Sequence, residues 1–149
     1  VVSPDVGSVG RARNFASRVD ASLAIVDKRR PKANAIEVMN VIGDVEGKTC
    51  LMVDDMIDTA GTIVQGAEAL MKNGAKEVYA CCTHGVLSGP AMKRLTESPI
   101  KEIAVLDTID IPEEIKNHPK IKILPTAKYF ARAIKTVFSE TSLSAIYED

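Results

Sequence analysis

Short runs of apolar and β-branched residues alternate along this chain with segments of helical periodicity. The apolar runs lie at 1–3, 23–26, 38–42, 49–53, 78–83, 103–106 and 121–124, and each predicts a short buried strand. Apolar residues recur three and four positions apart at 12–19, 60–71 and 127–138, which predicts amphipathic helices. Two shorter helical segments are expected at 88–95, where Pro90 suits a first helical turn, and at 112–116.

The expected strands are continuously apolar and do not alternate between apolar and polar residues. Such runs are typical of a parallel sheet whose two faces are both covered. The regular exchange of strands with helices is the chain order of that architecture. The sequence therefore predicts an α/β fold, with a mainly parallel sheet flanked by helices on both faces.

Composition narrows the class of protein. With 149 residues, 46% of them apolar, the chain is expected to form a single domain over 1–149 with its own core. Its 19 basic and 20 acidic residues argue against a general nucleic-acid binder, and no apolar run reaches the length of about 18 residues that a membrane span needs. The three cysteines lie in apolar runs, which indicates buried, reduced thiols and a cytoplasmic location.

Charged or ionisable residues stand where the expected strands end. They are Asp5, Asp27 with Lys28, Asp54 with Asp55, His84, and Asp107. Because ligands of open parallel sheets bind at the carboxyl ends of the strands, these side chains are candidates for one shared site. For His84, a structural hydrogen bond is favoured over a metal-binding role.

The stretch 50–62 combines two chemical devices. Asp54 and Asp55 follow an apolar strand, and their carboxylates can accept hydrogen bonds from vicinal ribose hydroxyls. Asp58, Thr59, Ala60, Gly61 and Thr62 then lead into a helix, whose first N–H groups and dipole favour a phosphate. Because a carboxylate against a phosphate is unfavourable, Asp58 is expected to contact a sugar hydroxyl or a metal-bound water.

A basic segment, 28–34, follows the second expected strand. It contains Lys28, Arg29, Arg30 and Lys32 around Pro31, with no large apolar residue to fix it to the core. It is expected to be an exposed, mobile loop.

Together these motifs resemble one enzyme family. The stretch 54–62 is similar to the phosphoribosyl diphosphate motif of the type I phosphoribosyltransferase fold. The segments Ser3-Pro4-Asp5-Val6-Gly7 and Asp27-Lys28-Arg29-Arg30-Pro31 further resemble ribose-phosphate diphosphokinases, in order and in spacing. The resemblance runs from Val1 into the C-terminal tail. The departures from the family pattern are Ser8, Gly10, Ala60 and Gly85.

The resemblance implies roles at the matching positions. Asp5 matches an aspartate that binds Mg²⁺ with the nucleotide. Lys28 and Arg30 match the catalytic-loop lysine and arginine, and Arg30 also contacts the substrates. Asp54, Asp55 and the stretch 58–62 match the ribose 5-phosphate site. The implied reaction transfers the diphosphoryl group of ATP to the anomeric hydroxyl of ribose 5-phosphate, giving phosphoribosyl diphosphate and AMP for nucleotide biosynthesis.

Three further expectations concern the whole protein. The chain starts inside an expected strand and without Met, so it is expected to be the C-terminal half of a longer enzyme and to be inactive alone. Self-association into dimers or hexamers is implied by the family. Two alternatives stay open: a phosphoribosyltransferase that consumes phosphoribosyl diphosphate, and a non-catalytic subunit associated with the synthetase.

Overall fold

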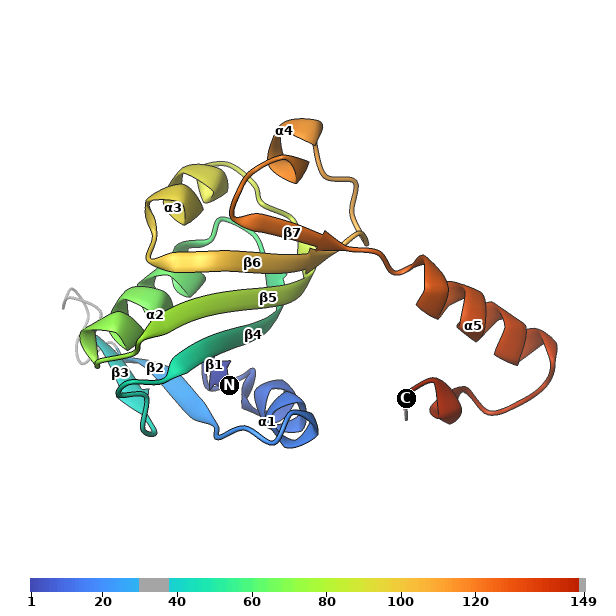
Figure 1. The fold of residues 1–149 in the computed structure, drawn as a ribbon, viewed down its shortest axis with the longest axis horizontal. Coiled ribbons are helices and arrows are strands. Elements are labelled where there is room, and N and C mark those ends of the chain that lie inside the picture. The colour runs from blue at the N-terminus through green and yellow to red at the C-terminus, as the bar shows by residue number, and fades with distance from the viewer. Residues whose placement is uncertain (30–37, 148–149) are drawn as a thin grey trace.

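The structure is a computed structural model that describes residues 1–29 and 38–147. Within these residues, one seven-stranded sheet has the strand order β3-β2-β1-β4-β5-β6-β7 (Figure 1). Its strands are β1 (Val2–Ser3), β2 (Ala24–Arg29), β3 (Val38–Ile42), β4 (Thr49–Ile57), β5 (Glu77–Gly85), β6 (Ile100–Leu106) and β7 (Ile121–Leu124). Neighbouring strands are parallel except β2 and β3, which are antiparallel. The expected mainly parallel sheet is confirmed.

Helices connect the strands and cover both faces of the sheet. They are α1 (Val9–Arg18), α2 (Gly61–Lys72), α3 (Ala91–Glu97), α4 (Glu113–Lys116) and α5 (Ala127–Phe138), followed by a 3-10 helix, η1 (Leu143–Tyr147). The chain leaves β1 through α1 toward β2, and leaves β4 through α2 toward β5 on the other side. Because such crossovers are right-handed, these opposite directions place α1 and α2 on opposite faces.

The main core lies between the sheet and the helices α2 and α3. Met52, Leu70, Leu95, Ile100 and Ile103 are its largest fully buried side chains. The helix α2 approaches β4 closely at Gly66, where a Cβ atom would lie 2.5 Å from Met52 Cε. Burial of these apolar side chains fixes α2, and with it the loop that enters α2.

Four strands, β2, β4, β5 and β6, are longer than the sequence predicts, and the extensions of β4 and β2 affect residues expected in the site. The strand β4 continues through Asp54 and Asp55 to Ile57, because β5 offers backbone partners along its whole length, including a pair between Asp54 and Cys82. The strand β2 likewise continues to Arg29, because it pairs with β3. The expected loop 28–34 therefore begins as strand, and its remaining residues, 30–34, lie outside the described ranges.

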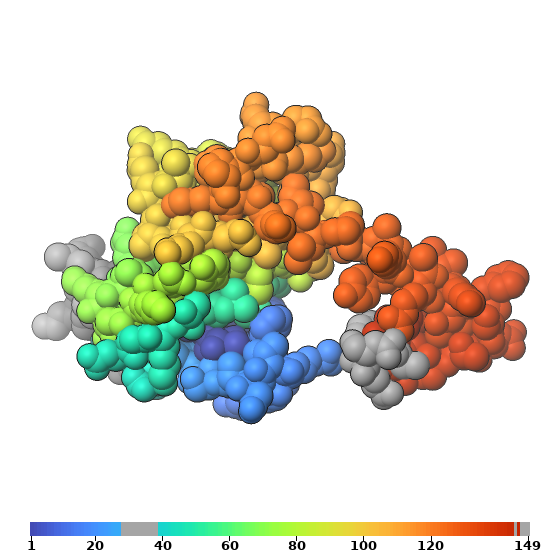
Figure 2. All heavy atoms as spheres, in the orientation of Figure 1, coloured from blue at the N-terminus to red at the C-terminus, as the bar shows by residue number. Residues whose placement is uncertain are grey.

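The helix α5 is formed where its periodicity predicts but has no sheet beneath it. None of its residues is buried, and Ile134 and Phe138 of its apolar side are 69% and 90% exposed. In Figures 1 and 2, α5 and the segment after it stand away from the rest of the molecule. Thr126 precedes this helix without a side-chain cap bond, because its hydroxyl donates to Asp107 at 2.6 Å.

The cysteines and the helices bear on the expected environment of the chain. All three thiols are free; Cys50 and Cys82 are buried and Cys81 is half-buried. Burial raises the pKa of Cys81 to about 11 and that of Cys82 to about 12, so both remain protonated at neutral pH. None of the helices in the described ranges is long and apolar enough to cross a membrane.

Candidate functional site

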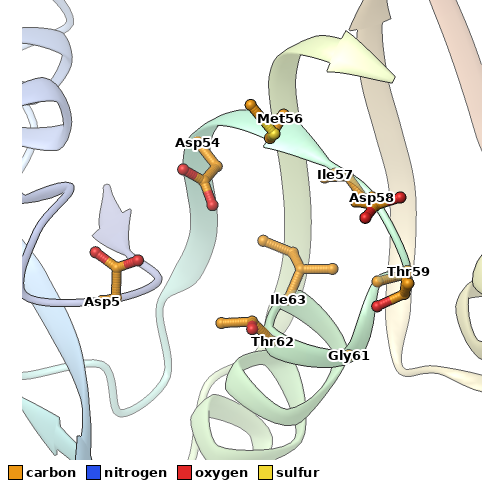
Figure 3. Close-up of a pocket in the computed structure, with 10 residues that line it drawn as sticks. Asp5, Asp54, Met56, Ile57, Asp58, Thr59, Gly61, Thr62 and Ile63 are labelled. Atoms are coloured by element: carbon orange, nitrogen blue, oxygen red, sulfur yellow. The ribbon is translucent and has the colours of Figure 1, made fainter. Parts of the chain in front are cut away.

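A cavity opens at the carboxyl ends of β1 and β4. Crossovers leave these two adjacent strands in opposite directions, which is the position where open α/β sheets bind ligands. The cavity has a volume of about 190 Å³, suited to a small ligand. It is lined by Asp5, Asp54, Met56, Ile57, Asp58, Thr59, Ala60, Gly61, Thr62 and Ile63 (Figure 3).

One wall of the cavity is the loop that enters α2. Ala60 has a left-handed backbone with φ of 60°, and α2 begins at the next residue, Gly61. The first N–H groups of a helix have no partner within it, and the helix dipole places positive charge at this end. Among the described residues, the backbone N–H groups of residues 59–62 donate no hydrogen bond to the protein. This wall can therefore bind an anion through its backbone N–H groups.

The opposite wall carries carboxylates. Asp5 lies on the loop after β1, where its Oδ1 accepts a hydrogen bond of 2.7 Å from the backbone N–H of Ser8. Asp54 lies on β4, and its Oδ1 accepts 2.9 Å from Arg11 Nη1 and 3.3 Å from the hydroxyl of Ser8. Figure 3 shows Asp5 and Asp54 on the same side of the cavity, across from Thr59 and Gly61.

Asp54 and Asp55 have different surroundings. Successive side chains of a strand point to opposite faces. The side chain of Asp54 is 18% exposed and lines the cavity, whereas that of Asp55 is 52% exposed, does not line it and pairs with Arg11 Nη2 at 3.0 Å. The two acids expected to act as equals are therefore placed unequally.

The pKa values of the two acids diverge for the same reason. Burial raises the pKa of Asp54, and the carboxylates of Asp55 and Asp5 act in the same direction. The backbone N–H of Asp55, which donates to Asp54 Oδ1 at 2.9 Å, lowers the pKa of Asp54 and so opposes that rise. For Asp55, burial acts to raise the pKa, but hydrogen bonding with Asp54 and the charge of Arg11 outweigh it and lower the pKa overall. This concentration of negative charge favours a cation or hydroxyl donors beside Asp54.

The site contains residues that sequence reasoning did not assign. Ser8 and Arg11 are three positions apart at the start of α1, so one helical turn brings both to Asp54. Ser88 and Arg94 also contact the loop before α2: the Ser88 hydroxyl donates to Asp58, and Arg94 Nη1 donates to the carbonyl of Thr59 at 2.9 Å. Nothing local in the sequence signals these last two contacts, because they depend on tertiary packing.

The remaining sequence candidates lie elsewhere or are undescribed. The backbone of Lys28 is in β2, paired with Met39, and Arg30 lies outside the described residues. His84 Nδ1 is 2.8 Å from the hydroxyl of Thr108, in keeping with a structural hydrogen bond.

A resident metal would need suitable ligands. In the portions 1–29 and 38–147, no three His, Cys, Asp or Glu side chains form a group that could hold a metal ion. Mg²⁺ is commonly held by one or two carboxylates together with waters and substrate phosphates. Asp5 and Asp54, whose carboxylates both face the cavity, fit that kind of site.

Comparisons with known proteins agree with one another. Ribose-phosphate pyrophosphokinase of Clostridium tetani is 60% identical over 148 residues, covering 99% of this chain and 46% of the relative. That of Caldanaerobacter subterraneus is 61% identical over 147 residues, with the same coverage. The crystal structure of phosphoribosylpyrophosphate synthetase from Mycobacterium smegmatis matches with a TM-score of 0.84 and 41% identity, over 93% of this chain and 44% of that one.

The chain thus spans about half the length of these relatives. The expectation that it is a C-terminal half is not supported by the comparisons, and it is not carried further. The expected phosphoribosyltransferase-like fold is confirmed by the structural match, which has both 41% sequence identity and a TM-score of 0.84. The family model described as "Phosphoribosyl synthetase-associated domain" matches residues 26–148. By this match, the chain belongs to the phosphoribosyl synthetase-associated domain family.

Proposed function

We propose that this chain forms the ribose 5-phosphate site of a ribose-phosphate diphosphokinase. The observation that carries the proposal is the composition of one cavity: an anion-binding loop faces two carboxylates across a space for a small ligand. A phosphate and a set of sugar hydroxyls are the two parts of ribose 5-phosphate. The names of the two relatives described above agree with this substrate class.

Each wall has its own task in this proposal. The N–H groups and hydroxyls of Thr59 to Thr62 bind the 5-phosphate, aided by the dipole of α2. Asp54 accepts hydrogen bonds from ribose hydroxyls and thereby orients the ring. Asp58 contacts a sugar hydroxyl or a metal-bound water. Asp55 supports Asp54 through the shared Arg11.

The chemistry is a diphosphoryl transfer from ATP to the anomeric hydroxyl. Charge spreads over the phosphate oxygens as the β-phosphorus is attacked, so positioning and cations carry most of the catalysis. Asp5 would hold Mg²⁺ together with substrate phosphates, and the ion would supply positive charge that neutralises the diphosphate. Lys28 and Arg30 are proposed to contact the transferring group and the substrates, and to exclude water by closing over them.

The location and assembly of the enzyme are part of the same proposal. Protonated, buried cysteines suit the reducing cytoplasm. The chain is proposed to self-associate, because the apolar side of α5 is exposed and a second copy can bury it.

Calorimetric titration of the chain tests whether ribose 5-phosphate is the ligand of this cavity. Ribose 5-phosphate should bind more tightly than ribose or inorganic phosphate, because only the sugar phosphate contacts both walls. Equal affinity for inorganic phosphate would contradict the two-wall site.

Turnover assays separate this function from its alternatives. We expect no AMP from ATP and ribose 5-phosphate with this chain alone, since it spans about half the length of the relatives that carry the enzyme's name. AMP production by the chain would contradict that part of the proposal. Base-dependent release of diphosphate from phosphoribosyl diphosphate would instead identify a phosphoribosyltransferase.

A further inference from the structure

The segment after β5 runs beside the loop that precedes α2. Three consecutive carbonyl groups, at the end of β4 and in that loop, accept hydrogen bonds from this segment and from α3, which follows it. The carbonyl of Ile57 accepts from Leu87 N at 3.0 Å, that of Asp58 from Ser88 N at 3.1 Å, and that of Thr59 from Arg94 Nη1 at 2.9 Å. The next carbonyl, of Ala60, accepts from Val64 N inside α2 at 3.1 Å.

These bonds fix the direction of the N–H groups as well. In a trans peptide unit, the carbonyl and the N–H of the following residue point in opposite directions, and no cis peptide is present in the described residues. Four consecutive carbonyls are held on the side of the 87–94 segment and of the helix interior. The N–H groups of residues 58–61 therefore point the other way, toward the space that these residues line.

Arg94 is distinct among the donors because it is charged. Its Nη1 lies 3.4 Å from the position that a Cβ on Gly61 would take, so its positive charge sits at the start of α2. Bonds from a charged donor are stronger than bonds between neutral groups. Ser88 adds a second constraint, because its hydroxyl donates to the Asp58 carboxylate while its N–H holds the Asp58 carbonyl.

We propose that Arg94 and Ser88 are positioning residues of the phosphate-binding loop. Arg94 holds the Thr59 carbonyl away from the cavity and so keeps the left-handed turn at Ala60 in place. Ser88 holds Asp58 in the orientation that serves the sugar side. Both act through the loop, and the inference rests on the proposed function for the identity of the ligand.

The test uses the full chain and two readouts. The first, without ligand, combines amide hydrogen exchange of Ser88 and Val64, whose N–H groups donate to the carbonyls of Asp58 and Ala60, with NMR line positions of residues 58–62. The second is calorimetric affinity for ribose 5-phosphate. Arg94→Ala removes both the bond and the charge, Arg94→Gln keeps an N–H donor without the charge, and Lys93→Ala removes a neighbouring exposed charge as a control.

We expect Arg94→Ala to raise the amide exchange of Ser88 and Val64 at least tenfold and to weaken ribose 5-phosphate binding about tenfold, because both amides donate to carbonyls next to that of Thr59. Arg94→Gln should lie closer to the unmodified chain than Arg94→Ala does, and Lys93→Ala should change either readout by less than twofold. Ser88→Ala should weaken binding about threefold and shift the Asp58 amide. Thermal unfolding verifies that each variant is folded, and the exposed position of Arg94 favours this.

Three outcomes are decisive and distinct. Unchanged amide exchange of Ser88 and Val64 in Arg94→Ala would overturn the positioning role, whatever ligand is used. Equal effects of Arg94→Gln and Arg94→Ala would also overturn it, because charge alone would then explain the loss. If the unmodified chain gives no response to ribose 5-phosphate, the proposed function fails, while the exchange measurement still decides the role of Arg94.

Discussion

The loop before α2 and the helix α5 are opposites in how they are held. In the loop, consecutive carbonyls from Ile57 to Ala60 all have partners, and the flanking helix is anchored by buried Leu70. In α5, no residue is buried and Ile134 is 69% exposed. The difference teaches that the chain supplies its ligand-binding loop from its own core, whereas α5 has an apolar side that only another surface can cover.

The largest expected effect sharpens this contrast through the core. Leu70→Ala in α2 should lower the free energy of unfolding by about 3 kcal/mol, because a fully buried side chain is lost and a cavity remains. Ile134→Ala in α5 should lower it by less than about 0.5 kcal/mol. Urea unfolding followed by circular dichroism measures both. Equal losses would show that α5 packs as the core does.

A substitution in the loop tests its electrostatic character. Gly61→Asp places a carboxylate at the start of α2, and it should weaken ribose 5-phosphate binding at least about 100-fold, or about 2.7 kcal/mol. Gly61→Asn is the matched control of equal size, and a loss of only a few-fold is expected there. Calorimetry decides; similar losses in both variants would indicate a steric effect and not a charge effect.

The apolar side of α5 is tested by its association. Ile134→Gln should weaken self-association about tenfold, or about 1.4 kcal/mol, because an exposed apolar contact is removed. Lys128→Gln changes a polar residue of the same helix and should leave association within twofold. Sedimentation equilibrium provides the constants. A chain that stays monomeric at every concentration would contradict the role given to α5.

The smallest expected effect concerns pH. Ribose hydroxyls bind the ionised form of Asp54, and burial raises the pKa of this carboxyl. Affinity for ribose 5-phosphate should therefore fall by about threefold as the pH drops through this raised pKa. The fall should occur at a higher pH than titration of an ordinary aspartate would give. Asp54→Asn should bind more weakly and lose this step. Persistence of the step in Asp54→Asn would assign it to another group.

Much of the fold was predictable because the signals were local. The continuous apolar runs located every strand of the sheet, and periodicity located α5 to the residue, 127–138. The end of β4 was not predictable, since the polarity of Asp54 and Asp55 indicates a loop, while β5 pairs with Asp54, Met56 and Ile57 and so continues the strand. The exposure of the apolar side of α5 was not predictable either. Periodicity shows that a helix has an apolar side, but it does not show which surface covers that side.

The residues of the candidate site also differ in whether the local sequence predicts them. Asp54 and residues 58–62 were predictable because acidic and small residues adjoin in the sequence and line one cavity. Arg94 and Ser88 were not, because they lie some 30 positions along the chain and reach the loop only through the packing of β5 and α3 beside it. The proposed roles of Lys28 and Arg30 remain predictions.

The shortest strand of the sheet has a kinetic consequence. Asp5 and the loop before α2 meet only because β1, two residues long, pairs with β4 through Val2 and Met52, which are 50 positions apart. Such a pairing closes a long loop for few contacts, so it belongs to the late part of folding. We expect a ligand that spans both walls to slow unfolding of the chain while leaving its folding rate almost unchanged.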